Sequence, residues 1–104
     1  MIASMAIVLL QVDAAYAASD AEVKALREAI DHEDSLAVIA ILEAAGGPLK
    51  ARELAKSASG ADFWASRCSY SIIADGDKET LTMYSWRGQS IVPIAGIVQP
   101  RPKK

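Results

Sequence analysis

The spacing of apolar residues changes once along this 104-residue chain, from a helical period to a period of two near Ser69. Between Ser19 and Gly60 apolar residues recur at intervals of three and four, which is typical of amphipathic helices. From Ser69 onward they alternate with polar residues, which is typical of half-buried strands. We therefore predict one small α+β domain in which N-terminal helices precede an antiparallel hairpin or three-stranded sheet.

The first part of the chain predicts two helices before its glycine pair. Ser19 and Glu22 have the spacing of a capping box, so the first helix begins near Asp20. Ser35 is placed to cap a second helix, which Gly46-Gly47 ends. Apolar residues cover nearly all sides of this second helix, which predicts that it lies at the centre of the core. These residues are Leu36, Val38, Ile39, Ile41 and Leu42.

A third helix is predicted from Leu49 to about Ala58. Pro48 suits its first turn, and Gly60 closes it. Its apolar spacing predicts an inward face made of Leu49, Ala51, Leu54 and Ala55.

The second part of the chain predicts a hairpin and a third strand. The runs SYSIIA and TLTMYSW are joined by a turn in which Asp75-Gly76 supplies positive φ. The third strand, residues 91–98, contains Pro93, which predicts an edge strand or a break because proline donates no hydrogen bond. Residues 99–104 are predicted to form an extended basic tail after the domain of residues 19–98. One face of the second strand is predicted to carry Thr80, Thr82, Tyr84 and Trp86, opposite Leu81 and Met83.

Residues 1–18 form an apolar segment with two interpretations. The run before Ala15-Tyr16-Ala17 resembles the hydrophobic region and cleavage site of a secretory signal, but no Lys or Arg precedes it. We therefore predict that the segment is retained as a packing arm and that the protein is cytoplasmic. The alternative is cleavage after Ala17 and a periplasmic or secreted protein. Gln11 and Asp13 interrupt the run, so it does not predict a membrane span.

The formal net charge of −2 conceals two halves of opposite sign. Residues 1–46 contain two basic and eight acidic side chains, a net charge of −6. Residues 47–104 contain nine basic and five acidic side chains, a net charge of +4. A polyanion would therefore be attracted to the second half.

The segment from Leu36 to Gly60, LAVIAILEAAGGPLKARELAKSASG, resembles the first two helices of winged helix-turn-helix domains. In that family a recognition helix and a β-hairpin wing follow. The resemblance implies a regulatory module that binds duplex DNA. It implies phosphate contacts from Lys50, Arg52, Lys56 and Arg67, base contacts from Ser66 and Ser69, and a wing contact from Lys78.

Two other interpretations of these features stay open. Residues 61–70 fit a short recognition helix or a strand, and in the second case the helix-turn-helix is incomplete. The basic residues could then form a solvated face, and the aromatic residues Trp64, Tyr84 and Trp86 could bind a protein partner. A third option is an accessory subunit of a larger assembly, to which residues 1–18 dock as an apolar arm, and self-association stays open as well.

No residue pattern predicts catalysis, a cofactor or a metal site. The chain has one Cys and one His, too few for a zinc site without several carboxylates. His32 is predicted to lie at a solvated helix end and Cys68 to be a buried, inert thiol. Asp75, Asp77 and Glu79 are predicted to belong to a turn rather than a calcium loop. We therefore predict a non-enzymatic protein without cofactors.

Overall fold

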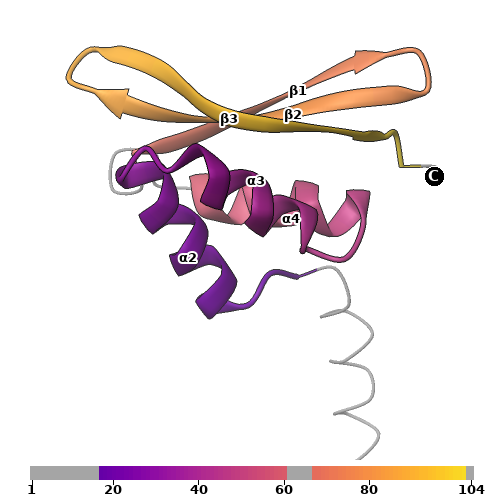
Figure 1. The fold of residues 1–104 in the computed structure, drawn as a ribbon, viewed down its shortest axis with the longest axis horizontal. Coiled ribbons are helices and arrows are strands. Elements are labelled where there is room, and N and C mark those ends of the chain that lie inside the picture. Colours follow the sequence, from indigo (N-terminus) through magenta and orange to yellow (C-terminus); the bar gives the residue numbers. More distant parts are fainter. Residues whose placement is uncertain (1–16, 61–66, 103–104) are drawn as a thin grey trace, which may run out of the picture.

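The computed structural model describes residues 17–60 and 67–102. The helices α2 (Asp20–Asp31), α3 (Ser35–Glu43) and α4 (Pro48–Ser59) precede the strands β1 (Cys68–Asp75), β2 (Lys78–Arg87) and β3 (Ser90–Pro100). The predicted α+β arrangement is confirmed. The three helices lie on one side of the sheet and leave its other face open (Figure 1).

The sheet is antiparallel, with the order β1-β2-β3. Two-residue turns join the strands, and the first central residue of each is a glycine, Gly76 with φ 64° and Gly88 with φ 63°. Positive φ at this position is typical of a type II′ turn, whose twist matches that of the flanking strands. The predicted hairpin is therefore present, and its turn comprises Gly76 and Asp77.

β3 is an edge strand that contains a bulge, as the proline in its sequence predicts. The pairs Met83–Ala95 and Tyr84–Pro93 leave Ile94 without a partner on β2. The Ser35 hydroxyl donates a hydrogen bond of 2.8 Å to the Ile94 carbonyl, so a helix residue occupies one of the exposed acceptors of this edge. Edges protected in this way resist pairing with further strands.

α3 buries one face, so the prediction of a central core helix is wrong. Val38 and Leu42 are buried, but Leu36 is 80% exposed and Ile39 and Ile41 are half-buried. The two-layer arrangement causes this result, because a helix packed on one sheet face keeps its opposite side in solvent. Asp34 caps α3 by accepting a hydrogen bond from the Ala37 amide, and Ser35 is its first residue.

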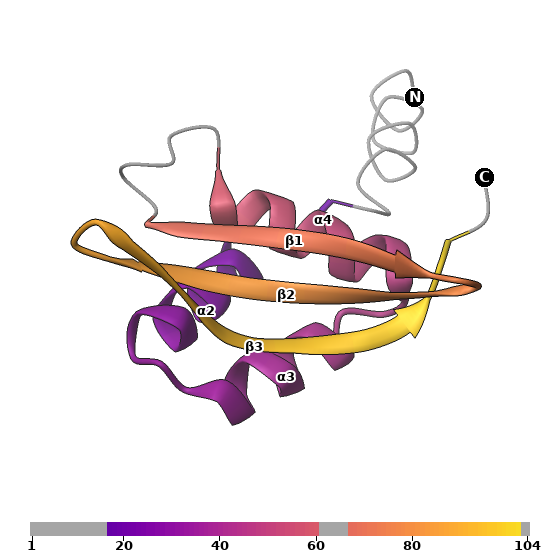
Figure 2. The ribbon, with the colours of Figure 1, turned by 90° about the horizontal axis from the view of Figure 1, so that it is seen from above.

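α4 follows its predicted bounds closely, but its buried face differs from the predicted one at Leu49. Ala51, Leu54 and Ala55 are buried as predicted, whereas Leu49 is exposed, contrary to prediction. The Arg27 guanidinium of α2 donates to the Ala58 carbonyl at 2.9 Å, and so satisfies an unpaired acceptor at the end of α4. Figure 2 shows α4 on the β1 side of the molecule and α3 on the β3 side.

The sheet extends beyond residue 98, where the basic tail was predicted to begin. β3 continues to Pro100, and Gln99 is buried. The Arg101 amide donates to the Asp77 carbonyl at 2.9 Å, and its guanidinium donates to the Gly76 carbonyl at 3.1 Å. These bonds attach the chain after β3 to the β1–β2 turn.

Candidate functional site

The structure distributes the predicted DNA-contacting residues over several parts of the domain. Lys50 and Lys56 are exposed on α4, and Lys78 is exposed at the start of β2. Arg67 is exposed immediately before β1, with a positive φ of 53°. Ser69 is half-buried on β1. Ser66 and the rest of residues 61–66, including Trp64, lie outside the described residues, while residues 68–70 form the first part of β1.

Arg67 and Lys78 lie at opposite ends of the β1–β2 hairpin. The Trp86 amide donates to the Arg67 carbonyl at one end, and Asp75 pairs with Lys78 at the other. The rise per residue of an extended strand separates the two positions by roughly 26 Å. Contacts from both residues would therefore have to span a long stretch of any one ligand.

The Arg52 side chain forms an ion pair with Glu79 and is therefore not a free cation on the surface of α4. Its Nε donates to Oε2 of Glu79 at 2.9 Å, and its Nη2 contacts Oε1 of the same carboxylate. Gln99 Nε2 also donates to Oε2 of Glu79, at 2.8 Å, and to the Pro48 carbonyl at 3.2 Å. The hydrogen bonds from Arg52 lower the pKa of Glu79 although burial opposes this effect.

The sequence analysis missed Glu79 and Gln99 as members of a buried polar cluster. Glu79 was assigned to a turn, yet it has the same alternation phase as the buried Leu81 and Met83. Gln99 has the same phase as Ile97, which packs against the core. Extending the period of two in both strands would have placed these polar side chains inward, next to the helices.

The open face of the sheet is made of four rows of side chains that cross the strands. Since Leu81 and Met83 face the helices, the alternate residues of β2 face away from them, as predicted. We call the following set the outer face. Its rows are Ile73, Thr80, Val98; Ser71, Thr82, Gly96; Ser69, Tyr84, Pro93; and Trp86, Ile91.

The outer face combines exposed aliphatic groups with uncharged polar groups, and charged residues border it at both ends: Asp75 and Lys78 beyond the row of Thr80, and Arg67 beside Trp86. Ile73 is 62% exposed and Val98 is 66% exposed, and Thr80 lies between them. The Ser71 and Tyr84 hydroxyls are hydrogen-bonded to each other at 2.9 Å, so each satisfies the other without a ligand. None of the eleven residues is acidic or basic. No described helix covers this face (Figure 2).

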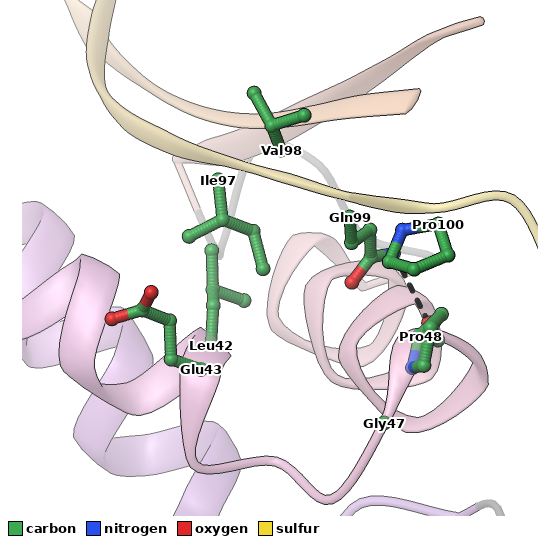
Figure 3. A pocket seen from close by; sticks show the side chains of 8 residues that line it. All are labelled: Leu42, Glu43, Gly47, Pro48, Ile97, Val98, Gln99 and Pro100. Carbon is green, nitrogen blue, oxygen red and sulfur yellow. Dashed lines mark hydrogen bonds between the residues drawn. The ribbon is translucent and has the colours of Figure 1, made fainter. Parts of the chain in front are cut away.

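A cavity lies on the other side of the sheet, beside β3. It has a volume of about 260 Å³ and is lined by residues of α3, the α3–α4 loop, α4 and β3. Leu42, Ile97, Pro48 and Pro100 supply apolar walls, and the side-chain oxygen of Gln99 is directed into the space between Leu42 and Pro48 (Figure 3). The remaining lining residues are Glu43, Gly47 and Val98.

Other candidate groups do not form a site within residues 17–60 and 67–102. Burial raises the pKa of the Cys68 thiol, which disfavours the reactive thiolate. In this part of the chain no three His, Cys, Asp or Glu side chains come together in a group that could hold a metal ion. Among the described helices none has the length and apolar content needed to cross a membrane.

Comparison with known proteins gives no relative from which a role could be transferred. No family model matches the chain, and neither the curated proteins nor the solved structures contain a match.

Proposed function

We propose that this chain is a non-enzymatic protein-interaction module whose outer face binds the outer face of a second copy. The single observation that carries the proposal is the row of Ile73, Thr80 and Val98, in which exposed aliphatic groups lie on a face that no described helix covers. Exposed contiguous apolar patches on small domains are typical of interaction sites.

The absence of charge in the middle of the outer face defines the chemistry of the partner surface. A carboxylate or ammonium group pressed against the middle of the outer face would lose its hydration, because the charged residues Arg67, Asp75 and Lys78 lie at the two ends. The partner surface must therefore be uncharged, and a flat sheet surface fits a flat sheet best. The outer face of a second copy meets both requirements, and two-fold contacts between identical surfaces are the commonest form of self-association.

The size of the outer face predicts a weak dimer. The four rows extend about 20 Å along the strands, and about 10 Å separates the axes of the two edge strands. This footprint is smaller than that of a standard stable interface, which buries about 800 Å² on each partner. We expect a dissociation constant of roughly 10 to 100 μM.

Sedimentation equilibrium over about 5 to 500 μM protein tests the proposal. The unaltered chain should form dimers, and Ile73→Lys and Val98→Lys should each weaken the dimer at least about tenfold by replacing an exposed aliphatic contact with a charge. Leu36→Lys is the matched control, because Leu36 is a more exposed aliphatic residue on the helical layer. A monomer at the highest concentration, or dimers that both outer-face variants leave unchanged, would refute the proposal.

A further inference from the structure

We propose that the edge of β1 that faces away from β2 binds an extended acidic peptide of a partner protein as an additional strand. The peptide pairs with the β1 backbone and directs alternate acidic side chains toward α4. This site is an edge of the sheet and not its outer face, so it is independent of the dimer. It rests on the backbone groups of β1, on the position of α4 and on two exposed cations.

The hydrogen-bonding phase of β1 and β2 leaves a row of backbone groups at the sheet edge. The Trp86 amide donates to the Arg67 carbonyl at 3.1 Å, so Arg67 and each second residue after it form the hydrogen-bonded pairs with β2. The intervening residues Tyr70, Ile72 and Ala74 direct their amides and carbonyls away from β2, and we call these groups the β1 edge. Within the described residues no strand pairs with the β1 edge.

β1 lacks the features that protect β3 from further pairing. β3 contains Pro93, Pro100, a bulge at Ile94 and the hydrogen bond from Ser35 to its edge. The eight residues of β1 include no proline, lysine or bulge, and Asp75 is the one charged residue among them. Natural sheets block their exposed edges against unwanted strands, and an unblocked edge is a template for pairing. Main-chain hydrogen bonds supply the affinity in this mode of peptide binding, and alternate side chains supply the specificity.

The position of α4 restricts the partner to a strand without a helical layer. α4 packs against β1 and lies beneath it (Figure 2). Paired strands are about 4.8 Å apart, so a second copy joined through its own β1 would place its α4 about 5 Å from this one. Packed helices need about 8 to 10 Å between their axes. An extended peptide carries no helix and avoids this collision.

The last turn of α4 brings a lysine beside the start of β1. Arg27 of α2 donates to the Ala58 carbonyl at 2.9 Å, and the same side chain partly opposes the burial that raises the pKa of Cys68. The end of α4 therefore lies near the first residue of β1. Lys56 belongs to this last turn and is exposed.

Lys56 lies on the side of α4 that faces the sheet. Arg52, one turn earlier, donates to Glu79 of β2. This hydrogen bond raises the pKa of Arg52, and Tyr70 of β1 adds a smaller electrostatic effect, so the guanidinium is near β1 as well. Side chains four residues apart share one face of a helix, and Lys56 is therefore on the same face as Arg52.

Two cations that no described carboxylate neutralises thus lie at the start of β1. Lys56 and Arg67 are exposed, and neither forms an ion pair with a described residue. At the other end of the strand, Asp75 is directly opposite Lys78, which offsets its charge. Peptide residues opposite Tyr70 share its face of the sheet, the one that packs on the helices. Acidic side chains at these positions complement the two cations.

NMR titration of the full chain with the heptapeptide Ac-TETETET-NH₂ tests the proposal. We expect saturable shifts of the Tyr70, Ile72 and Ala74 amides, with a dissociation constant of roughly 0.1 to 1 mM at low salt. Hydrogen exchange of these amides should slow when the peptide binds. The charge-reversed peptide Ac-TKTKTKT-NH₂ should bind at least about tenfold more weakly. A titration without saturable shifts of these amides, or equal binding of the two peptides, would overturn the proposal.

Three variants separate backbone pairing from charge. Ala74→Pro removes an amide of the β1 edge without removing a hydrogen bond to β2, and it should weaken binding at least about fivefold. Lys56→Gln should weaken binding about threefold at low salt, whereas Lys50→Gln, an exposed lysine on another face of α4, should leave it unchanged. If the proline variant does not fold, the lysine variants and the charge-reversed peptide still decide. Equal effects of the two lysine variants would count against the proposal.

Hydrogen exchange of the free chain identifies any other occupant of the β1 edge. Without peptide, the amides of Tyr70, Ile72 and Ala74 should exchange fast. Slow exchange at every protein concentration would assign the edge to another segment of this chain, and slow exchange that increases with concentration would assign it to a second copy. Either result overturns the proposal. Val98→Lys, which weakens the proposed dimer, should bind the peptide with unchanged affinity, because Val98 lies on β3.

Discussion

Arg52 of α4 and Glu79 of β2 form an ion pair that joins the helical layer to the sheet. The Glu79 side chain has no exposed surface, while that of Arg52 is 35% exposed. A buried carboxylate is costly unless its oxygens are paired, and here both contact the guanidinium while Gln99 donates to Oε2. Arg52, which the sequence predicted to contact DNA, thus has a structural role.

Replacing Arg52 should destabilise the protein more than replacing an exposed cation of the same helix. Arg52→Met leaves the Glu79 carboxylate buried with Gln99 as its remaining side-chain donor, and we expect a loss of about 2 to 3 kcal/mol of unfolding free energy. Lys56→Met, the control on α4, should change it by less than about 0.5 kcal/mol. Urea unfolding measures both, and similar values for the two variants would contradict a structural ion pair.

Stability should fall in acid in a way that depends on Glu79. The pKa of Glu79 is lowered in the folded protein, so its stabilising effect is present above the unfolded pKa of about 4.3 and is lost as the pH falls through the folded value. Glu79→Gln should therefore show a flatter decline of unfolding free energy below about pH 4.3. Ser19 lowers the pKa of Glu22 equally in both proteins, so this contribution cancels. Parallel pH profiles would exclude Glu79 as a source of the decline.

Truncation of two leucines of α3 should reduce the unfolding free energy by very different amounts. Leu42 is buried against the sheet, so Leu42→Ala should cost about 2 to 5 kcal/mol. Leu36→Ala should cost less than about 0.5 kcal/mol because Leu36 is exposed. Denaturant melts of the two variants provide the comparison, and comparable losses would show that the face of α3 is assigned incorrectly.

The nucleic-acid hypothesis makes a prediction of its own about salt. Five phosphate contacts, from Lys50, Arg52, Lys56, Arg67 and Lys78, predict a log-log salt slope of roughly −4 to −5 for duplex DNA. Because Arg52 is bonded to Glu79, one contact fewer is expected, and the slope becomes roughly −3.6. Fluorescence anisotropy of a labelled duplex measures this slope.

Variants of the residues predicted to contact DNA test whether both ends of the β1–β2 hairpin bind it. Arg67→Ala and Lys78→Ala should each reduce the slope by about one unit, and changes at Ser66 and Ser69 should alter sequence preference without changing the slope. No binding at about 50 mM salt and micromolar protein would remove the hypothesis, since phosphate contacts are strongest at low salt.

Local patterns in the sequence determined the type and order of the elements. The Ser19–Glu22 capping box and Gly76 each act through backbone conformation within a few residues, so the start of α2 and the first turn were predictable. Gly46-Gly47 marked the loop after α3, although the helix itself ends earlier, at Glu43 with Ala44 as its C-cap. The alternation along β2 likewise predicted which of its central side chains face outward.

Only the tertiary structure decided which side of each helix is buried and which polar groups meet. Leu36 and Leu49 are as apolar as Leu42, but burial depends on where the sheet lies relative to the helix, a choice that nonlocal packing makes. Arg52 and Glu79 are 27 residues apart, and Gln99 is a further 20 residues along the chain. Such a cluster has no local signature, because the desolvation that forces its members to pair arises only when α4 packs against the sheet.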